Sequence, residues 1–371
     1  MRLPLVPCLL LSATLRLAGD DAIRIGMFAS LTGREASFGQ TNHRGAAFAV
    51  EELNAAGGVL GRQLELIAED TRSLQGEAAT ATKKLVTRDK VVAVVSGTGS
   101  SAALEAAPIC QTAGVPLMAA AATNPRVTEA GDYIFRACFI DPFQGTALAK
   151  FARGSLKAKR VAVLVSSNNA YSVGLAKYFR ARFTADGGVV VAETRYNEGD
   201  KDFRAQLPAL KAASPDAIFG SGNYTESALI CVQARQLGLT VPLFGGDTWD
   251  TPALTEIAGK SAEGACFTGH FSPDSADPAV QGFVRRFRAR WGESPDIGTS
   301  LGYEAVQLLA DAIRRAGSTD GAKIRDALAA TRDFAGVTGR ITIDAQRNAS
   351  KSAVIFTVKE GRFIYVGSVA P

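Results

Sequence analysis

The sequence predicts an α/β protein with two lobes, each built around a parallel sheet, and three observations lead to this prediction. The chain has 371 residues, more than one ordinary hydrophobic core accommodates, so two domains are expected. Short apolar runs alternate with amphipathic segments, and this alternation restarts after Pro142. The strand runs are apolar almost throughout, as a parallel sheet covered on both faces by helices requires.

The first unit begins with a strand over residues 23–29 and a helix over residues 40–56, which Gly57 and Gly58 end. Gly114 ends the last helix of this unit in the same way. The other elements expected here are, in order, a strand at 63–68, a helix at 76–88, a strand at 91–95, a helix at 100–113 and a strand at 115–121.

The second unit repeats the alternation, which indicates a second sheet of the same kind. Its expected elements are, in order, a helix at 143–156, a strand at 160–165, a helix at 173–186, a strand at 189–194, a helix at 203–213, a strand at 217–220, a helix at 226–237, a strand at 242–245, a helix at 252–262 and a strand at 265–269.

The pattern changes over residues 278–330, where three helices follow one another with no strand between them. The chain then ends in a strand at 340–343 and a hairpin-like pair turned by Glu360 and Gly361, with strands at 353–359 and 362–366. Elements added after two complete units indicate that the chain crosses between the lobes more than once. The candidate crossings lie at 139–142, 271–273 and 345–348.

The N-terminus has the layout of a secretory signal peptide. Arg2 precedes an apolar run over residues 3–15, and the small residues Ala18 and Gly19 follow it. We therefore expect residues 1–19 to direct export of the protein. No other stretch approaches the roughly 20 apolar residues of a membrane span.

The composition excludes several classes of protein. Hydrophobic residues make up 47% and charged residues 21%, values typical of a folded globular protein and not of a disordered chain, a fibre or a coiled coil. The net charge of +5 comes from Lys and Arg scattered among Asp and Glu, so no nucleic-acid-binding surface is expected. His43 and His270 are the only histidines and lie far apart, so no metal site or other cofactor is expected.

Four cysteines follow the expected signal peptide, and none forms a Cys-x-x-Cys pair. Four cysteines allow three disulfide pairings, among which the sequence does not choose. Buried free thiols are the simpler interpretation.

The loops after the strands are where an open α/β sheet binds its ligands. The strand at 91–95 runs into the glycine-rich loop 96–101, directly before a helix, where backbone N–H groups and the helix dipole suit a carboxylate or phosphate. Capping of that helix by Ser100 is the alternative. The loop matches no nucleotide, dinucleotide or hydrolase motif, so an enzyme is not expected.

Other strand ends offer further polar side chains. Thr123 follows the strand at 115–121, as a ligand donor or as a turn residue. Asp247 follows the strand at 242–245, where a carboxylate could pair with a cation, whereas Asp250 is a candidate cap for the next helix. Tyr171 and Tyr224 each place an aromatic ring near the same edge.

Short motifs with a characteristic order and spacing extend over most of the chain. They are Ser30-Leu31-Thr32-Gly33 with Phe38-Gly39, Asn54-Ala55-Ala56-Gly57-Gly58-Val59-Leu60-Gly61, Gly97-Thr98-Gly99-Ser100-Ser101, Ala121-Ala122-Thr123, Tyr171-Ser172-Val173-Gly174, Asp202-Phe203, Gln233-Ala234-Arg235-Gln236-Leu237-Gly238, Ala262-Glu263-Gly264 and Gly339-Arg340-Ile341-Thr342-Ile343-Asp344. With these motifs the chain resembles the leucine/isoleucine/valine-binding family of periplasmic solute receptors for ABC importers, from about residue 23 to 366.

The resemblance implies the type I periplasmic binding fold, in which two Rossmann-like lobes are joined by a three-segment hinge and trap the ligand between them. Residues 20–141 with 272–348 would form the N-terminal lobe. Residues 142–271 with 349–371 would form the C-terminal lobe.

The resemblance also implies how the ends of an amino acid are bound. Ser100 and Thr123 match hydroxyl residues that hold the α-carboxylate and the ammonium together with backbone groups at Ala121. Asp247 stands where relatives place an acid against the ammonium, usually Glu. The shorter side chain would shift the ligand or admit a water molecule.

A second set of residues would form the ligand side-chain pocket by the same resemblance. Tyr171 from the C-terminal lobe and Phe38 from the N-terminal lobe match aromatic residues of that pocket. Asn223 stands where some relatives have Tyr. Thr98 and Gly99 replace bulkier residues.

The function implied is that of a monomeric, non-enzymatic receptor that binds a branched-chain or small aliphatic α-amino acid. Donors on one lobe and Asp247 on the other would satisfy the two charges of a zwitterion, so binding favours closure, which a membrane permease reads. The alternatives are an amide, urea or aromatic carboxylate ligand in the same transport role, or a sensory ligand-binding domain on the same fold.

Overall fold

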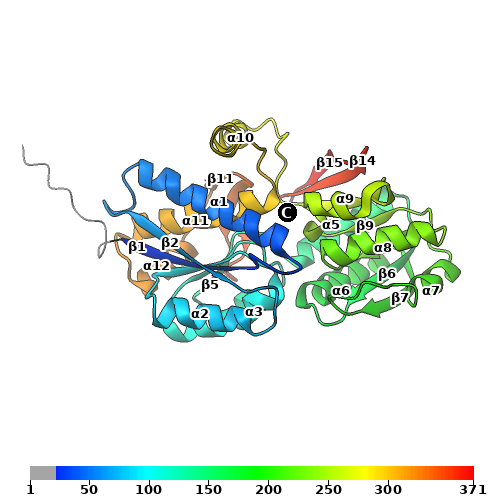
Figure 1. Cartoon of the computed structure of the whole chain (residues 1–371), viewed down its shortest axis with the longest axis horizontal. Helices are drawn as coiled ribbons and strands as arrows, with labels where there is room; N and C mark the ends of the chain where they lie inside the picture. Colours follow the sequence, from blue (N-terminus) through cyan, green and yellow to red (C-terminus); the bar gives the residue numbers. More distant parts are fainter. Residues whose placement is uncertain (1–21) are drawn as a thin grey trace, which may run out of the picture.

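The computed structural model describes residues 22–371 of the chain, so the predicted signal peptide lies outside the described residues. Two lobes lie side by side along the long axis of the molecule, each around its own sheet (Figure 1). The first sheet is entirely parallel, and its strands follow the order β2 (Leu64–Asp70), β1 (Ile23–Ala29), β3 (Ala93–Ser96), β4 (Leu117–Ala119) and β5 (Ile134–Arg136).

The second sheet has seven strands and is parallel except at one edge, where β14 pairs antiparallel with both β10 and β15. Its order is β15 (Arg362–Val369), β14 (Ala353–Lys359), β10 (Cys266–Gly269), β9 (Leu243–Gly245), β8 (Ala217–Gly220), β6 (Arg160–Ser166) and β7 (Val189–Tyr196). A small antiparallel sheet consists of β11 (Phe334–Gly336), β12 (Gly339–Ile343) and β13 (Ala349–Ser350).

Helices cover both faces of each large sheet. They are α1 (Ala36–Ala55), α2 (Glu77–Thr87), α3 (Ser100–Ala113), α4 (Arg126–Glu129), α5 (Asp141–Gly154), α6 (Ala170–Ala185), α7 (Leu207–Ala212), α8 (Tyr224–Gln236), α9 (Pro252–Ala258), α10 (Pro278–Trp291), α11 (Ile297–Ala316) and α12 (Gly321–Ala329), with short 3-10 helices η1 (Asp247–Trp249) and η2 (Gly259–Ala262).

Alternate residues of one strand enter different cores, because successive side chains of a strand point to opposite faces. On β1, Met27 packs into the core shared with α1 and α11, whereas Phe28 packs into the core shared with α2 and α3. Helices α1 and α11 cross closely at Gly45, where an added Cβ would overlap the backbone carbonyl of Thr299.

The predicted fold class, an α/β protein with two lobes built around parallel sheets, is confirmed.

The sequence analysis did not predict several short helices and strands. Helix α4 and strands β5, β11 and β13 were not predicted, because segments of two to four residues carry no measurable periodicity. The expected helix at 203–213 shrinks to α7, and that at 252–262 divides into α9 and η2. The described cysteines Cys110, Cys138, Cys231 and Cys266 are buried and free, so the prediction of free thiols is confirmed.

Three connecting segments pass between the large sheets, after β5, after β10 and after β13. They touch one another: the Phe139 ring stacks on the His270 ring with their centroids 3.6 Å apart, and Lys351 Nζ donates to the Ala137 carbonyl at 3.3 Å. Lys351 also forms an ion pair with Glu304 at 2.9 Å, and both side chains are fully buried. The connections are therefore one packed unit. Within residues 22–371, no helix is both long and apolar enough to cross a bilayer.

Candidate functional site

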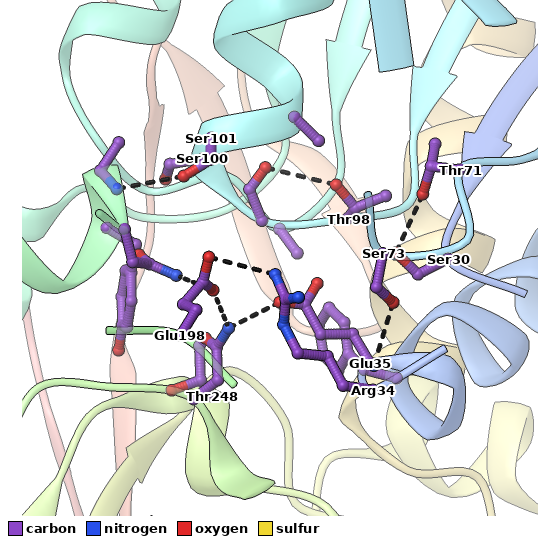
Figure 2. A pocket seen from close by; sticks show the side chains of 18 of the residues that line it. Ser30, Arg34, Glu35, Thr71, Ser73, Thr98, Ser100, Ser101, Glu198 and Thr248 are labelled. Atoms are coloured by element: carbon purple, nitrogen blue, oxygen red, sulfur yellow. Dashed lines mark hydrogen bonds and ion pairs between the residues drawn. The ribbon is translucent and has the colours of Figure 1, made fainter. Parts of the chain in front are cut away.

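A cavity of about 540 Å³ lies between the two lobes. Its polar lining includes Ser30, Arg34 and Glu35 from one lobe and Glu198 and Thr248 from the other (Figure 2). Most of the lining residues lie in the segments that follow β1, β2, β3, β4, β6, β7, β8 and β9, since the carboxyl ends of parallel strands meet at one edge of each sheet.

Eight of the nine predicted binding residues line this cavity: Phe38, Thr98, Gly99, Ser100, Ala121, Tyr171, Asn223 and Asp247. Thr123 is not among the lining residues, and its side chain is fully buried. The Thr123 backbone carbonyl accepts the backbone N–H of Asp141. Burial raises the pKa of the Asp141 side-chain carboxyl to about 8.

Ser100 does not cap its helix. Gly99 occupies the N-cap of α3, and the Ser100 hydroxyl oxygen accepts the backbone N–H of Asn124 at 3.1 Å. The Ser100 hydroxyl thus lines the cavity and bonds to the segment that follows β4. The alternative role of Asp250 is wrong as well, because Thr251 is the N-cap of α9 and no side chain caps that helix.

Asp247 is held by three hydrogen-bond donors. Its Oδ1 accepts from Gln144 Nε2 at 2.6 Å and from the Tyr171 hydroxyl at 2.8 Å, and its Oδ2 lies 3.0 Å from His270 Nε2. Tyr171, which the resemblance assigns to the side-chain pocket, thus also binds Asp247. An added Cβ at Gly246 would overlap the Tyr171 hydroxyl, so this approach requires glycine.

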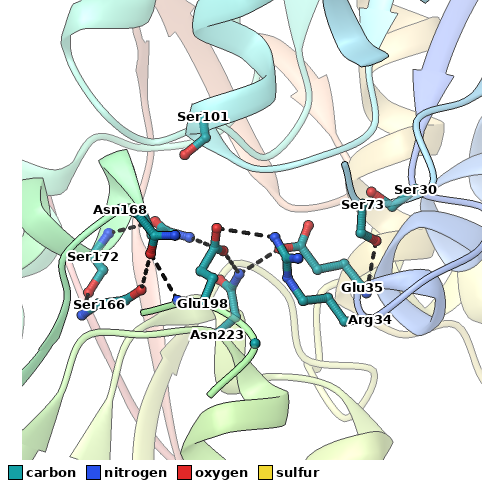
Figure 3. Close-up of polar contacts among 12 residues, drawn as sticks. Ser30, Arg34, Glu35, Ser73, Ser101, Ser166, Asn168, Ser172, Glu198 and Asn223 are labelled. Carbon is teal, nitrogen blue, oxygen red and sulfur yellow. Dashed lines mark hydrogen bonds and ion pairs between the residues drawn. The ribbon is translucent and has the colours of Figure 1, made fainter. Parts of the chain in front are cut away.

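A cluster of polar side chains from both lobes makes contacts across the cavity (Figure 3). Arg34 Nη2 forms an ion pair with Glu198 Oε2 at 3.2 Å, and Asn223 Nδ2 donates to Glu35 Oε1 at 2.7 Å and to Glu198 Oε1 at 3.0 Å. We call Arg34, Glu35, Glu198 and Asn223 the polar bridge. Burial, followed by repulsion from Glu198, raises the pKa of Glu35 to about 7.

Further contacts between the lobes flank the polar bridge. The Tyr224 hydroxyl donates to the Arg34 carbonyl at 2.9 Å, and Asn124 Nδ2 donates to the Ala170 carbonyl at 2.7 Å. The backbone N–H of Ala170 donates to the Ser101 hydroxyl at 3.1 Å. These contacts hold the two lobes together across the cavity, and we call this arrangement the closed form.

A family pattern described as periplasmic binding protein matches residues 22–362, nearly the whole chain. The chain belongs to this periplasmic binding protein family. A curated relative is the leucine-, isoleucine-, valine-, threonine- and alanine-binding protein of Pseudomonas aeruginosa, 32% identical over 326 residues, which are 87% of this chain and 86% of the relative. The predicted resemblance is therefore confirmed.

Two solved structures resemble this periplasmic binding protein closely. The leucine binding protein LivK from Thermotoga maritima is 40% identical with a TM-score of 0.90, and the match covers 94% of this chain and 99% of LivK. The branched-chain amino acid binding protein LivJ from Streptococcus pneumoniae, in complex with isoleucine, is 35% identical with a TM-score of 0.89, covering 94% and 100%.

The sequence analysis missed several residues of this periplasmic binding protein's cleft. Arg34, Glu35 and Glu198 are charged residues in loops, a pattern that more often marks solvated surface, and only the approach of the lobes makes them partners. Gln144 and His270 lie beneath the lining, where no strand-end pattern indicates them. Among residues 22–371, no group of three or more His, Cys, Asp or Glu side chains is arranged to hold a metal ion.

Proposed function

We propose that this periplasmic binding protein is the receptor of an ABC importer and binds a branched-chain or small aliphatic α-amino acid in the cavity between its lobes. The names of the relatives, which bind leucine, isoleucine, valine and related amino acids, support this ligand class. We further propose that the segment 1–19 directs export to the periplasm, that the receptor acts as a monomer without catalysis, and that a membrane permease recognises its closed form.

The observation that carries the proposal is the division of charge between the two walls of the cavity. One wall offers the N-terminus of α3, where the first backbone N–H groups lack partners within the helix, and the Ser100 hydroxyl. The opposite wall offers the Asp247 carboxylate. A zwitterion with its carboxylate toward α3 and its ammonium toward Asp247 would satisfy both walls, at about 1.5–3 kcal/mol for each charged hydrogen bond.

The lining as a whole also favours a ligand that carries an ammonium. It contains four carboxylate side chains, those of Glu35, Glu105, Glu198 and Asp247, but the single guanidinium of Arg34. A ligand with a carboxylate alone would enter this field at a disadvantage. An amino acid adds a positive charge at the acidic wall.

Phe38 is the residue best placed to contact an aliphatic side chain. It lines the cavity and packs against the hydrophobic cores of both lobes. Leu74 and Leu104 add apolar surface to the lining. Contact with both lobes through Phe38 would let burial of an aliphatic group favour the closed form.

Isothermal titration calorimetry against the twenty amino acids, benzoate and urea tests the proposal. We expect heat with leucine, isoleucine or valine, and an affinity lower by at least about tenfold in Asp247→Asn, which keeps the shape but removes the charge. Lobe closure on binding would reduce the radius of gyration in X-ray scattering. Binding of benzoate but of no amino acid, or equal amino-acid affinity in Asp247→Asn, would contradict the proposal.

A further inference from the structure

The orientation of the Asp247 carboxylate is fixed by three hydrogen bonds from side chains of the protein. An ionised carboxylate has about four acceptor positions, and three of them are taken: two on Oδ1, by Gln144 and Tyr171, and one on Oδ2, by His270. One acceptor position remains, on Oδ2. Asp247 is 5% exposed and lines the cavity, so this position is available to a ligand there.

From this arrangement we propose that Gln144, Tyr171 and His270 are positioning residues, which hold Asp247 so that the cleft selects an α-amino acid over the same molecule without its amino group. The inference rests on the proposed function and names the residues by which the receptor would distinguish an amino acid from a ligand without an amino group.

The three donor side chains are themselves restricted by their surroundings. Gln144 is fully buried, and its second amide hydrogen is donated to the Thr268 hydroxyl at 2.8 Å. Tyr171 is 4% exposed and passes over Gly246, where no side chain could be accommodated. The carboxylate is therefore confined to one orientation, which reduces the freedom that ligand binding must remove.

His270 acts as a neutral donor. Because a carboxylate only accepts, the hydrogen between the two groups belongs to His270 Nε2. Burial lowers the pKa of His270, against the opposing effect of Asp247, and Nδ1 has no partner among residues 22–371. A protonated ring would leave a charged N–H group buried without an acceptor, so the neutral form is favoured.

His270 also connects Asp247 to the segments that join the lobes. It follows β10 directly, and its ring stacks on Phe139 in the connection after β5, with the two planes only 16° apart. A shift of Asp247 would therefore require the packed connections to shift too. The carboxylate shares the rigidity of the hinge region and cannot adapt to a ligand that lacks the ammonium.

The cost of a missing ammonium follows from this rigidity. A ligand without an amino group would leave the last acceptor position of a buried carboxylate unsatisfied, and a fixed site cannot relax to avoid that loss. If the donors are removed, Asp247 gains freedom and the selectivity falls. The measured quantity is the selectivity ratio, the Kd of 4-methylpentanoate divided by the Kd of L-leucine.

The experiment uses the purified protein and titrates it with L-leucine, and with 4-methylpentanoate by displacement of L-leucine. Tyr171→Phe removes one hydroxyl without changing the ring, and His270→Phe keeps a ring against Phe139 but removes the donor. His270→Gln restores an amide N–H near the position of Nε2. Tyr224→Phe is the matched control, since its hydroxyl also lies at the cavity but donates to the Arg34 carbonyl.

We expect the selectivity ratio to fall about tenfold in Tyr171→Phe and His270→Phe, to stay within about threefold of the wild type in His270→Gln, and to stay unchanged in Tyr224→Phe. A merely structural role would weaken both ligands equally and leave the ratio unchanged, which would overturn the inference. If the wild-type protein bound no branched-chain or small aliphatic amino acid at all, the proposed function would be overturned, and the inference with it.

Discussion

We predict that Glu35 makes closure of the cleft dependent on pH. In the closed form, burial and the repulsion of Glu198 raise the pKa of Glu35 from 4.5 to about 7, with a smaller contribution from Glu226 and an opposing one from Arg34. In an open form the lobes separate and Glu35 meets water, so its pKa returns toward 4.5. Closing then takes up a proton, and a fall in pH favours closure.

The magnitude follows from proton linkage. The contribution of Glu35 to closure is complete below its open-form pKa and is lost as the pH rises through its closed-form pKa of about 7. With these two values, the closing constant falls about tenfold between about pH 6 and pH 8. At about pH 7 the binding of one ligand molecule should take up about half a proton.

Calorimetric titration with L-leucine across this pH range, in two buffers with different ionisation enthalpies, measures both quantities. Glu35→Gln is the matched control, because the amide oxygen can still accept from Asn223 but the side chain no longer titrates. We expect the variant to bind with little dependence on pH. A wild-type affinity that does not change with pH, or an equal slope in Glu35→Gln, would refute the reasoning.

Four further predictions concern buried groups of the core and of the cleft. Lys351→Met should lower the free energy of unfolding in urea by about 3–5 kcal/mol, because the fully buried Glu304 carboxyl would lose its ion-pair partner. The cysteines of the described chain should react with a thiol reagent only after unfolding, since they are buried and burial raises the pKa of Cys231 to about 12; labelling of the native protein would contradict this. In nitrogen NMR spectra, His270 should still be neutral, with its hydrogen on Nε2, at about pH 6.5, where a free imidazole is half protonated, because burial lowers its pKa. Gly246→Ala should weaken L-leucine binding about tenfold or more, as the added methyl group displaces the hydroxyl that holds Asp247.

The sequence by itself was sufficient for the fold class and for the location of the cleft. Strand and helix patterns depend on neighbouring residues, so the segments 23–29, 100–113 and 217–220 were predicted with the bounds that the structure has. The family resemblance assigned nine residues to the ligand, and eight of them line one cavity. Those that follow strands lie together because parallel strands end at a common edge.

The sequence could not indicate which polar groups are partners within that cleft. Glu35 and Asn223 are 188 positions apart, and Asp247 and Gln144 are 103 apart, so their hydrogen bonds depend on how the lobes and helices approach one another. The sequence also could not indicate which strand-end hydroxyls reach the cavity: Thr123 follows a strand, but its side chain is fully buried and does not line the cavity.

Only the tertiary structure decided the states of the ionisable groups. Burial and charged neighbours from distant segments raise the pKa of Glu35 and lower that of His270, and neither effect is visible in the local sequence. Local periodicity determines the elements because it acts over a few residues. Desolvation and hydrogen-bond geometry act through space, and so they are specified only once the two lobes are folded and packed together.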